Sequence, residues 1–224
     1  MGQGISAVLT YAIGVAISPI PIIAVILMLF SKRATVNGPL FLAGWALSLA
    51  VVAGVVYAIS DTSSVDSSNS ASDTVSWLKI VLGALFLWLA VRQWRGRPAS
   101  GAEPEMPKWM TGVDAFTPGK AFGIAVLLAA VNPKNLLLTI GAATGLAQLG
   151  LSTGDAVVSI VVFVIVASLT IAVPVVYYLV GGDRARTELD SMKGWLAAHN
   201  AAVMTVLFLV FGVDLIAKGI PPLT

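Results

Sequence analysis

The chain has 224 residues, of which 58% are hydrophobic and only 11% are charged, and its mean hydropathy is +0.93. Soluble domains carry about 25% charged residues, so this composition excludes a soluble protein and indicates an integral membrane protein. The net charge of +2 is too small to indicate a nucleic-acid-binding surface. The sequence has no cysteine and one histidine, His199, so we expect no disulfide, no thiol relay, no metal centre and no cofactor.

Apolar segments of the roughly 20 residues that a helix needs to cross a bilayer recur along the chain. They predict an all-α integral membrane protein with six transmembrane helices, at residues 5–30, 38–60, 76–95, 119–148, 154–180 and 198–218. The first segment has no basic residue before it and no convincing cleavage site of small residues after it. We therefore expect it to be a retained span and not a signal peptide.

Prolines interrupt the first and the fourth of these segments. The interrupting motifs are Ser18-Pro19-Ile20-Pro21 and Asn132-Pro133-Lys134-Asn135. A proline inside a helix removes one N–H group and frees the carbonyl four residues earlier, here the carbonyls of Val15, Ile17 and Ala129. In lipid such groups need partners, so we expect both breaks to be packed within the protein or to line a wet cavity.

The connections between the segments differ in charge. Basic residues occur in 31–33, 96–118 and 181–197, whereas 61–73 and 150–155 contain none. We expect the polar stretch 61–73 to be a solvated loop. The positive-inside rule then places the first, third and fifth connections in the cytoplasm, with both termini on the outside of the plasma membrane.

The two halves of the chain resemble one another. When the second half is aligned on the first, residues of the same or a similar kind coincide: Pro19 falls on Pro133, Ser18 on Asn132, Ser48 on Ser168 and Phe86 on Phe208. Because each half has three spans, the second half enters the membrane from the opposite side, which predicts an inverted-topology repeat. We expect a first three-helix repeat at residues 1–95, a cytoplasmic linker at 96–118 and a second repeat at 119–224.

Lys134 is the most informative single residue, because a charge near mid-bilayer costs at least about 2.5–3.5 kcal/mol unless it meets water or a partner. We expect its side chain to face the protein interior, as a substrate site, a counter-ion or a proton-coupled group. The alternative is a structural lysine that snorkels or pairs to hold the helix break. Asn132 and Asn135 flank it, and their amides suit the freed carbonyls at least as well as a ligand.

Asp214 is the acidic residue that lies well inside an apolar segment. It is therefore a candidate partner for Lys134 or for a coupling proton. Lys218 follows it by four residues, so an ordinary i, i+4 pair near the membrane surface is an equally good interpretation.

A half-helix begins after each proline break, and its free N–H groups and positive dipole end favour an anionic group. Together with Lys134, the two breaks predict a positive pocket that favours an anionic or zwitterionic substrate over a cation. An intramembrane enzyme is disfavoured, because His199 has no companion nucleophile or acid in the sequence pattern. No P-loop motif is present, so transport would draw on an ion gradient or a partner.

The paired motifs and the two three-span halves resemble the lysine exporter superfamily, and the overall pattern is similar to its GAP family, the Sap-like glycolipid-addressing proteins of actinobacteria. The resemblance covers essentially the whole chain, and its motif positions here are Ser18, Pro19, Pro21, Asn132, Pro133 and Lys134. Lack of cysteine excludes the thiol-relay branch, and one histidine with few intramembrane carboxylates argues against the metal-exporting branches.

The resemblance implies a plasma-membrane exporter, often a homodimer, that moves cell-envelope glycolipids outward. The residues and the resemblance together predict alternating access around a substrate-binding or coupling site made of Ser18, Pro19, Pro21, Asn132, Pro133, Lys134, Asn135 and Asp214. One alternative is an accessory subunit of a larger lipid transporter with no flux of its own. Another is an exporter of amino acids or other small solutes.

Overall fold

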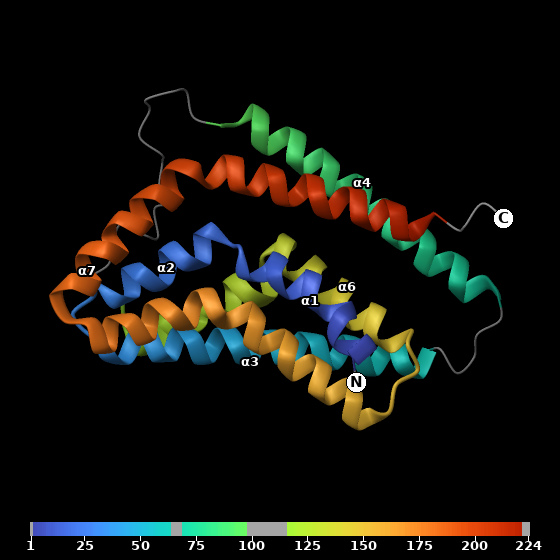
Figure 1. Cartoon of the computed structure of the whole chain (residues 1–224), viewed down its shortest axis with the longest axis horizontal. Helices are drawn as coiled ribbons and strands as arrows, with labels where there is room; N and C mark the ends of the chain where they lie inside the picture. The colour runs from blue at the N-terminus through green and yellow to red at the C-terminus, as the bar shows by residue number, and fades with distance from the viewer. Residues whose placement is uncertain (1, 64–68, 98–115, 221–224) are drawn as a thin grey trace. The chain divides into compact units, whose positions relative to one another are not determined.

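The computed structural model describes residues 2–63, 69–97 and 116–220, and no strand occurs among them (Figure 1). The elements are helices α1 (Gly2–Ala16), α2 (Pro19–Leu29), α3 (Ala34–Ser63), α4 (Asn69–Arg95), α5 (Pro118–Val126), the π-helical turn η4 (Leu127–Val131), α6 (Pro133–Ala147) and α7 (Thr153–Gly219). The all-helical architecture that the sequence predicts is therefore confirmed for the described residues.

Several helices are long and apolar enough to cross a membrane. Within the described residues these are Ala34–Asp61, Thr153–Gly182 and Arg184–Gly219, and there are up to 5 spans if each of two bent helix pairs counts as one. The chain is thus a membrane protein by length and composition of its helices. α4, which covers the predicted span 76–95, is not among these helices, so the count of six spans stays a prediction.

Both proline motifs bend the chain, as predicted. The helix axis bends by 58° between α1 and α2, and by 60° between the helix formed by α5 and η4 and helix α6. Ser18 and Asn132 are the residues before α2 and α6, and both have extended backbone, with ψ of 98° and 118°. Each is followed by a proline at the first helical position. A proline disfavours helical backbone in the residue before it and fits the start of a helix, so the sequence itself sets both bends.

The sequence analysis predicted a connecting loop at 181–197, but the structure has a helix there, so this prediction is wrong. Gly182 interrupts α7 with φ 59° and ψ −144°, and the helix resumes at Arg184. In this segment Ala185, Leu189 and Leu196 are buried at helical spacing, while charged residues lie between them. The segment is therefore an amphipathic helix. The prediction of a loop relied on its charged residues and overlooked the helical spacing of its apolar residues.

The polar stretch 61–73 is also shorter as a loop than expected, because α3 continues to Ser63 and α4 begins at Asn69. Most of the predicted linker 96–118 lies outside the described residues. At its end Thr117 caps α5, since its hydroxyl accepts a hydrogen bond from the backbone N–H of Lys120 at 3.3 Å.

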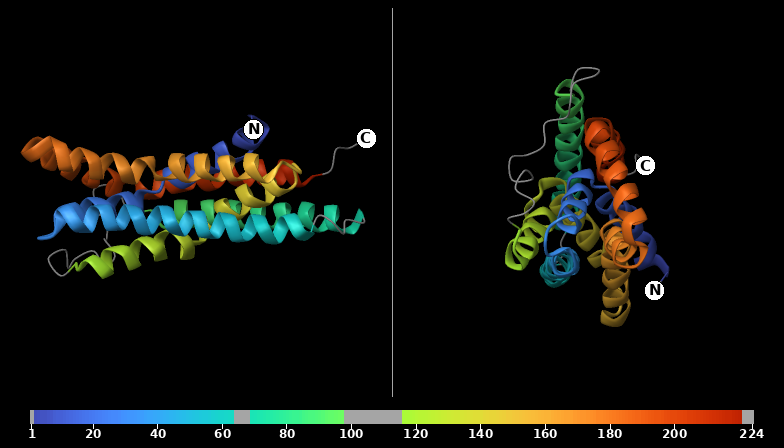
Figure 2. Two further views of the ribbon diagram at one scale, coloured as in Figure 1. Left: turned by 90° about the horizontal axis from the view of Figure 1, so that it is seen from below. Right: turned by 90° about the vertical axis from the view of Figure 1, so that its left-hand side faces the viewer.

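The chain forms two compact units, and each contains parts of both predicted repeats. The larger unit comprises Met1–Thr62 and Glu105–Ala197, and the smaller comprises Ser63–Pro104 and Ala198–Thr224. In the larger unit α1 packs along α6, and α3 runs beside residues 153–182 of α7 (Figures 1 and 2). Trp45 on α3 donates its indole N–H to the carbonyl of Ala167 on α7 at 3.3 Å.

The smaller unit packs α4 against the last part of α7. The rings of Phe86 and Phe208 lie 5.5 Å apart between centroids. A Cβ atom added to Gly83 would lie 2.7 Å from the carbonyl oxygen of Gly212, so the two helices cross closely at these glycines. Small residues at such crossings are typical of helix packing in membranes.

We expect Gly182→Ala to destabilise the protein, because the backbone angles of Gly182 lie in a region that is essentially open only to glycine. The expected loss of unfolding free energy is about 1–3 kcal/mol, the usual strain of such a conformation. The matched control is Gly194→Ala in the helix that follows, where an added Cβ meets nothing within 4 Å. Thermal unfolding in detergent should show a lower Tm for the first variant and no loss for the control.

Candidate functional site at the paired helix breaks

Lys134 occupies the second position of α6, and its side chain is 3% exposed. It reaches across to the other break, where its Nζ donates to the backbone carbonyl of Ile17 at 2.8 Å and to Oγ of Ser18 at 2.6 Å. The prediction that this lysine faces the protein interior is therefore correct in the structure. The same contacts show that it holds the first break, as the structural alternative required.

Ser18 and Asn135 complete the link between the breaks. The hydroxyl of Ser18 accepts from Lys134 and donates to Oδ1 of Asn135 at 3.0 Å. The amide of Asn135 donates in turn to the carbonyl of Leu128 at 2.9 Å, just before the second break. Asn135 is fully buried, so one side chain connects α2, η4 and α6.

Backbone groups at the two breaks find partners in different ways. The carbonyl of Ile17, released by Pro21, takes Lys134, as described above. The carbonyl of Ala16 accepts from the hydroxyl of Thr170 on α7 at 2.7 Å. At the second break the N–H of Asn132 bonds to the carbonyl of Leu127 at 3.1 Å, which closes a π-helical turn. A π-bulge of this kind is common at functional sites.

Asn132 has the structural role that the sequence suggested for it. Its Oδ1 accepts from the backbone N–H of Lys134 at 3.1 Å and so caps α6. Ser18, its counterpart in the first break, makes no such cap, because its hydroxyl bonds to Lys134 and Asn135. The two breaks therefore match in backbone and differ in the use of their capping residues.

The ammonium of Lys134 has no ion-pair partner among the described residues. An ammonium has three donors, and two of them are engaged by Ile17 and Ser18. The site is thus a buried cation surrounded by neutral oxygens, and one donor has no partner in the described part of the chain.

Asp214 pairs with Lys218, as the alternative interpretation of an i, i+4 pair predicted. Its carboxylate accepts from Nζ of Lys218 at 2.9 Å, an i, i+4 pair in the last part of α7. Asp214 belongs to the smaller unit, whereas Lys134 and both breaks belong to the larger one. The structure thus shows Lys218 as a partner of Asp214, and the place of Asp214 in the site stays a prediction.

A family model described as Sap, sulfolipid-1-addressing protein, matches residues 8–221, which include both breaks and Lys134. The chain belongs to this family. A search of the curated proteins and a search of the solved structures gave no match. Membership of the Sap family confirms the glycolipid-addressing resemblance that the sequence motifs indicated, while the link to the lysine exporter superfamily stays a resemblance.

Sequence reasoning missed Thr170 as a member of the site of this Sap-family protein. Its hydroxyl bonds to Ala16, and its side chain also lines an apolar cavity beside α2. Threonine within a membrane helix commonly bonds to its own helix, as Ser48 does with the carbonyl of Gly44 at 2.7 Å. The sequence therefore carried no signal that separates Thr170 from such residues.

Proposed function

We propose that this Sap-family protein moves an anionic amphipathic lipid, a cell-envelope glycolipid, outward across the plasma membrane by alternating access at the paired breaks. The observation that carries the proposal is the set of hydrogen bonds that joins them: Lys134 to Ile17 and Ser18, and Ser18 to Asn135. These bonds join two interrupted helices. Such interruptions at membrane depth are buried in protein or line a cavity, and transporters build their substrate sites from them.

The charge at the breaks favours an anion. The N-termini of α2 and α6 both begin at the breaks, and Lys134 adds a buried positive charge there. The unengaged donor of Lys134 is suited to a sulfate, phosphate or carboxylate oxygen. The family name refers to a sulfolipid, and a sulfate group has the charge and the acceptor oxygens that this arrangement favours.

The packing of the helices supports an inverted repeat as part of the proposal. Phe86 and Phe208, which coincide when the halves are aligned, lie against one another in the smaller unit. In the larger unit, α3 bonds to α7 through Trp45 and Ala167, and α1 packs along α6. Elements from corresponding spans thus contact each other, as they would around a pseudo-twofold axis.

We therefore propose that access alternates by breaking and remaking the bonds between Lys134 and the first break. Substrate oxygens would replace Ile17 and Ser18 as acceptors for the ammonium. Energy would come from an ion gradient or a partner protein. In this proposal both termini face outward. Lys32, Arg33 and the beginning of the helix at Arg184 lie at the cytoplasmic side.

An accessory role in a larger lipid transporter is the second candidate. It is favoured by one observation, the nearly complete burial of Lys134 with two donors engaged inside the protein. In that case the bonds between the breaks would serve stability alone, and the chain would move no lipid by itself.

Lipid movement in proteoliposomes tests the proposal. A sulfated glycolipid with a fluorescent acyl chain is placed in both leaflets, an ion gradient is imposed, and the outer-leaflet fraction is followed by quenching with dithionite. We expect the protein to speed outward movement of the sulfated lipid over protein-free vesicles, and to act less on the same lipid without the sulfate. Absence of movement for every lipid, together with copurification of a lipid transporter, would support the accessory role.

A further inference from the structure

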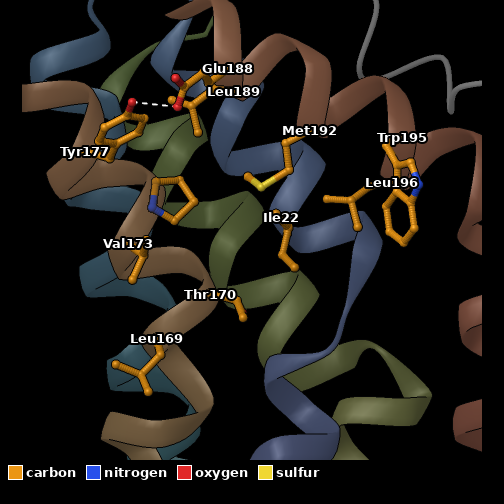
Figure 3. A pocket seen from close by; sticks show the side chains of 11 residues that line it. Ile22, Leu169, Thr170, Val173, Tyr177, Glu188, Leu189, Met192, Trp195 and Leu196 are labelled. Atoms are coloured by element: carbon orange, nitrogen blue, oxygen red, sulfur yellow. Dashed lines mark hydrogen bonds between the residues drawn. The ribbon is translucent and has the colours of Figure 1, made fainter. Parts of the chain in front are cut away.

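A cavity of about 580 Å³ lies in the larger unit, between α2 and the two helical segments of α7 on either side of Gly182 (Figure 3). Ile22 lines it from α2, Leu169 and Val173 from the first segment, and Met192 and Leu196 from the second. Its volume falls in the range of pockets that bind small molecules, about 300–1,000 Å³.

The wall of this cavity is apolar apart from one end. Figure 3 shows Tyr177 and Glu188 together at that end and Leu169 toward the other. The hydroxyl of Thr170 is engaged by the carbonyl of Ala16, so it offers no free donor to a ligand. A long, largely apolar cavity with one polar end is suited to an acyl chain attached to a polar head group.

The polar end contains a hydrogen-bonded cluster. Tyr177 donates its hydroxyl to Oε2 of Glu188 at 2.7 Å, and Nε of Arg184 donates to Oε1 of the same carboxylate at 2.9 Å. The side chain of Arg184 is 84% exposed, and within the described residues its other guanidinium donors are not engaged. Free guanidinium donors can bind a phosphate or sulfate through two parallel hydrogen bonds.

Residues 184–197, the first part of the helix that carries Arg184, have the pattern of a helix at a membrane surface. Its buried face consists of Ala185, Leu189 and Leu196, and Trp195 is exposed beside them. Its polar face carries Arg184 and Arg186 together with Glu188 and Asp190. Lys193 pairs with Asp190 at 2.6 Å and lies 5.4 Å from the ring of Phe30 at the end of α2. An amphipathic segment of this kind, here 184–197, is typical of the level of the lipid head groups, and the helix continues to Gly219 as a candidate membrane span.

We propose that this cavity binds an acyl chain of an anionic lipid, with the head group held at its mouth by Arg184. The role of this cavity in transport rests on the proposed function. The cavity would hold the hydrocarbon part of the transported lipid in the same unit as the breaks. Thr170, which borders the cavity and bonds to Ala16, connects the two places. Binding itself requires no transport, so the two proposals can fail separately.

Because the chain has no cysteine, a single introduced cysteine can report on the cavity. Val173→Cys places a bimane label on its wall, and Ile165→Cys places the same label on the same helix outside the lining residues. The two side chains are 61% and 57% exposed, so they form a matched pair. The purified variants in detergent micelles are titrated with phosphatidylglycerol or phosphatidylcholine that carries a nitroxide at the end of one acyl chain.

We expect saturable quenching for Val173→Cys, with half-saturation at about fivefold lower phosphatidylglycerol than phosphatidylcholine, the effect of one basic residue near an anionic head group. For Ile165→Cys we expect quenching that rises in proportion to the lipid fraction, without head-group preference. Adding Arg184→Gln to the Val173→Cys variant should reduce the preference to one or below, because Glu188 then loses its basic partner. The quenching should stay saturable, because the acyl chain still occupies the cavity.

Equal, non-saturable quenching at both positions would overturn the proposal, since the label would then report only on surrounding lipid. Shielding from the nitroxide together with disulfide-linked dimers of Val173→Cys would overturn it too, because a second copy would occupy the cavity. Saturable quenching without lipid movement in proteoliposomes would contradict the transport function and leave the lipid site standing. Lipid movement with equal quenching would contradict the lipid site alone.

Discussion

Lys134→Met is expected to reduce outward lipid movement in proteoliposomes by about 10- to 150-fold, while the protein remains folded. The ammonium is the charge on which the proposed binding of an anion depends, and methionine has a similar shape without it. Loss of a charged hydrogen bond to substrate is worth about 1.5–3 kcal/mol, or roughly a 10- to 150-fold change in an equilibrium constant. The loss in rate would be larger if transport also requires the ammonium to exchange its bonds to Ile17 and Ser18 for bonds to the substrate.

Stability decides between the functional and the structural interpretation of Lys134. The variant leaves the carbonyl of Ile17 without its donor, which costs about 1–3 kcal/mol. It also removes a charge whose burial in a membrane costs about 2.5–3.5 kcal/mol or more. The two effects offset one another, so we expect the unfolding free energy to change by less than about 1 kcal/mol.

Two measurements complete this prediction. Lys218→Met serves as a control, because Lys218 is half-exposed and pairs with Asp214 on the same helix turn, and it should transport as the unmodified protein does. Transport by Lys134→Met at the unmodified rate would remove the lysine from the mechanism. Lost transport together with a strongly lowered Tm would show that its role is structural.

The breaks could be predicted from the sequence because the effect of proline is local. Pro19 and Pro133 each remove one N–H group and disfavour helical backbone in the residue before, whatever surrounds them. Burial of Lys134 followed from the same kind of reasoning, since a charge inside an apolar segment must turn away from lipid. The carbonyl of Ile17 was identified as needing a partner, and the structure gives it that lysine.

The partners contributed by other helices could not be predicted in the same way. Thr170 reaches Ala16 only because α7 passes beside the first break, and no property of the threonine itself indicates this. For Asp214 the sequence left two partners open, and the structure shows the neighbour on the same helix, Lys218. The helix beginning at Arg184 was not predicted because the segment is rich in charged residues, although its apolar residues have helical spacing.

Asn135→Leu is expected to give the largest loss of stability of any substitution at the breaks. Leucine has a similar volume but removes the donor to the carbonyl of Leu128 and the acceptor for the hydroxyl of Ser18. Each buried polar group left without a partner costs about 1–3 kcal/mol, so the sum is about 2–6 kcal/mol. That sum is a large part of the 5–15 kcal/mol that ordinarily stabilises a folded protein.

The matched control is Asn132→Ser, three positions earlier in the same motif. Asn132 caps α6 by accepting from the backbone N–H of Lys134, and serine is an equally good cap, so its unfolding free energy should change by less than about 0.5 kcal/mol. Thermal unfolding and limited proteolysis in detergent would compare the two variants. If Asn135→Leu were as stable as the control, the bonds from Asn135 to Ser18 and Leu128 would not hold the breaks together. The link between the two interrupted helices would then depend on Lys134 alone, and the proposed opening of the site would need no further bond to break.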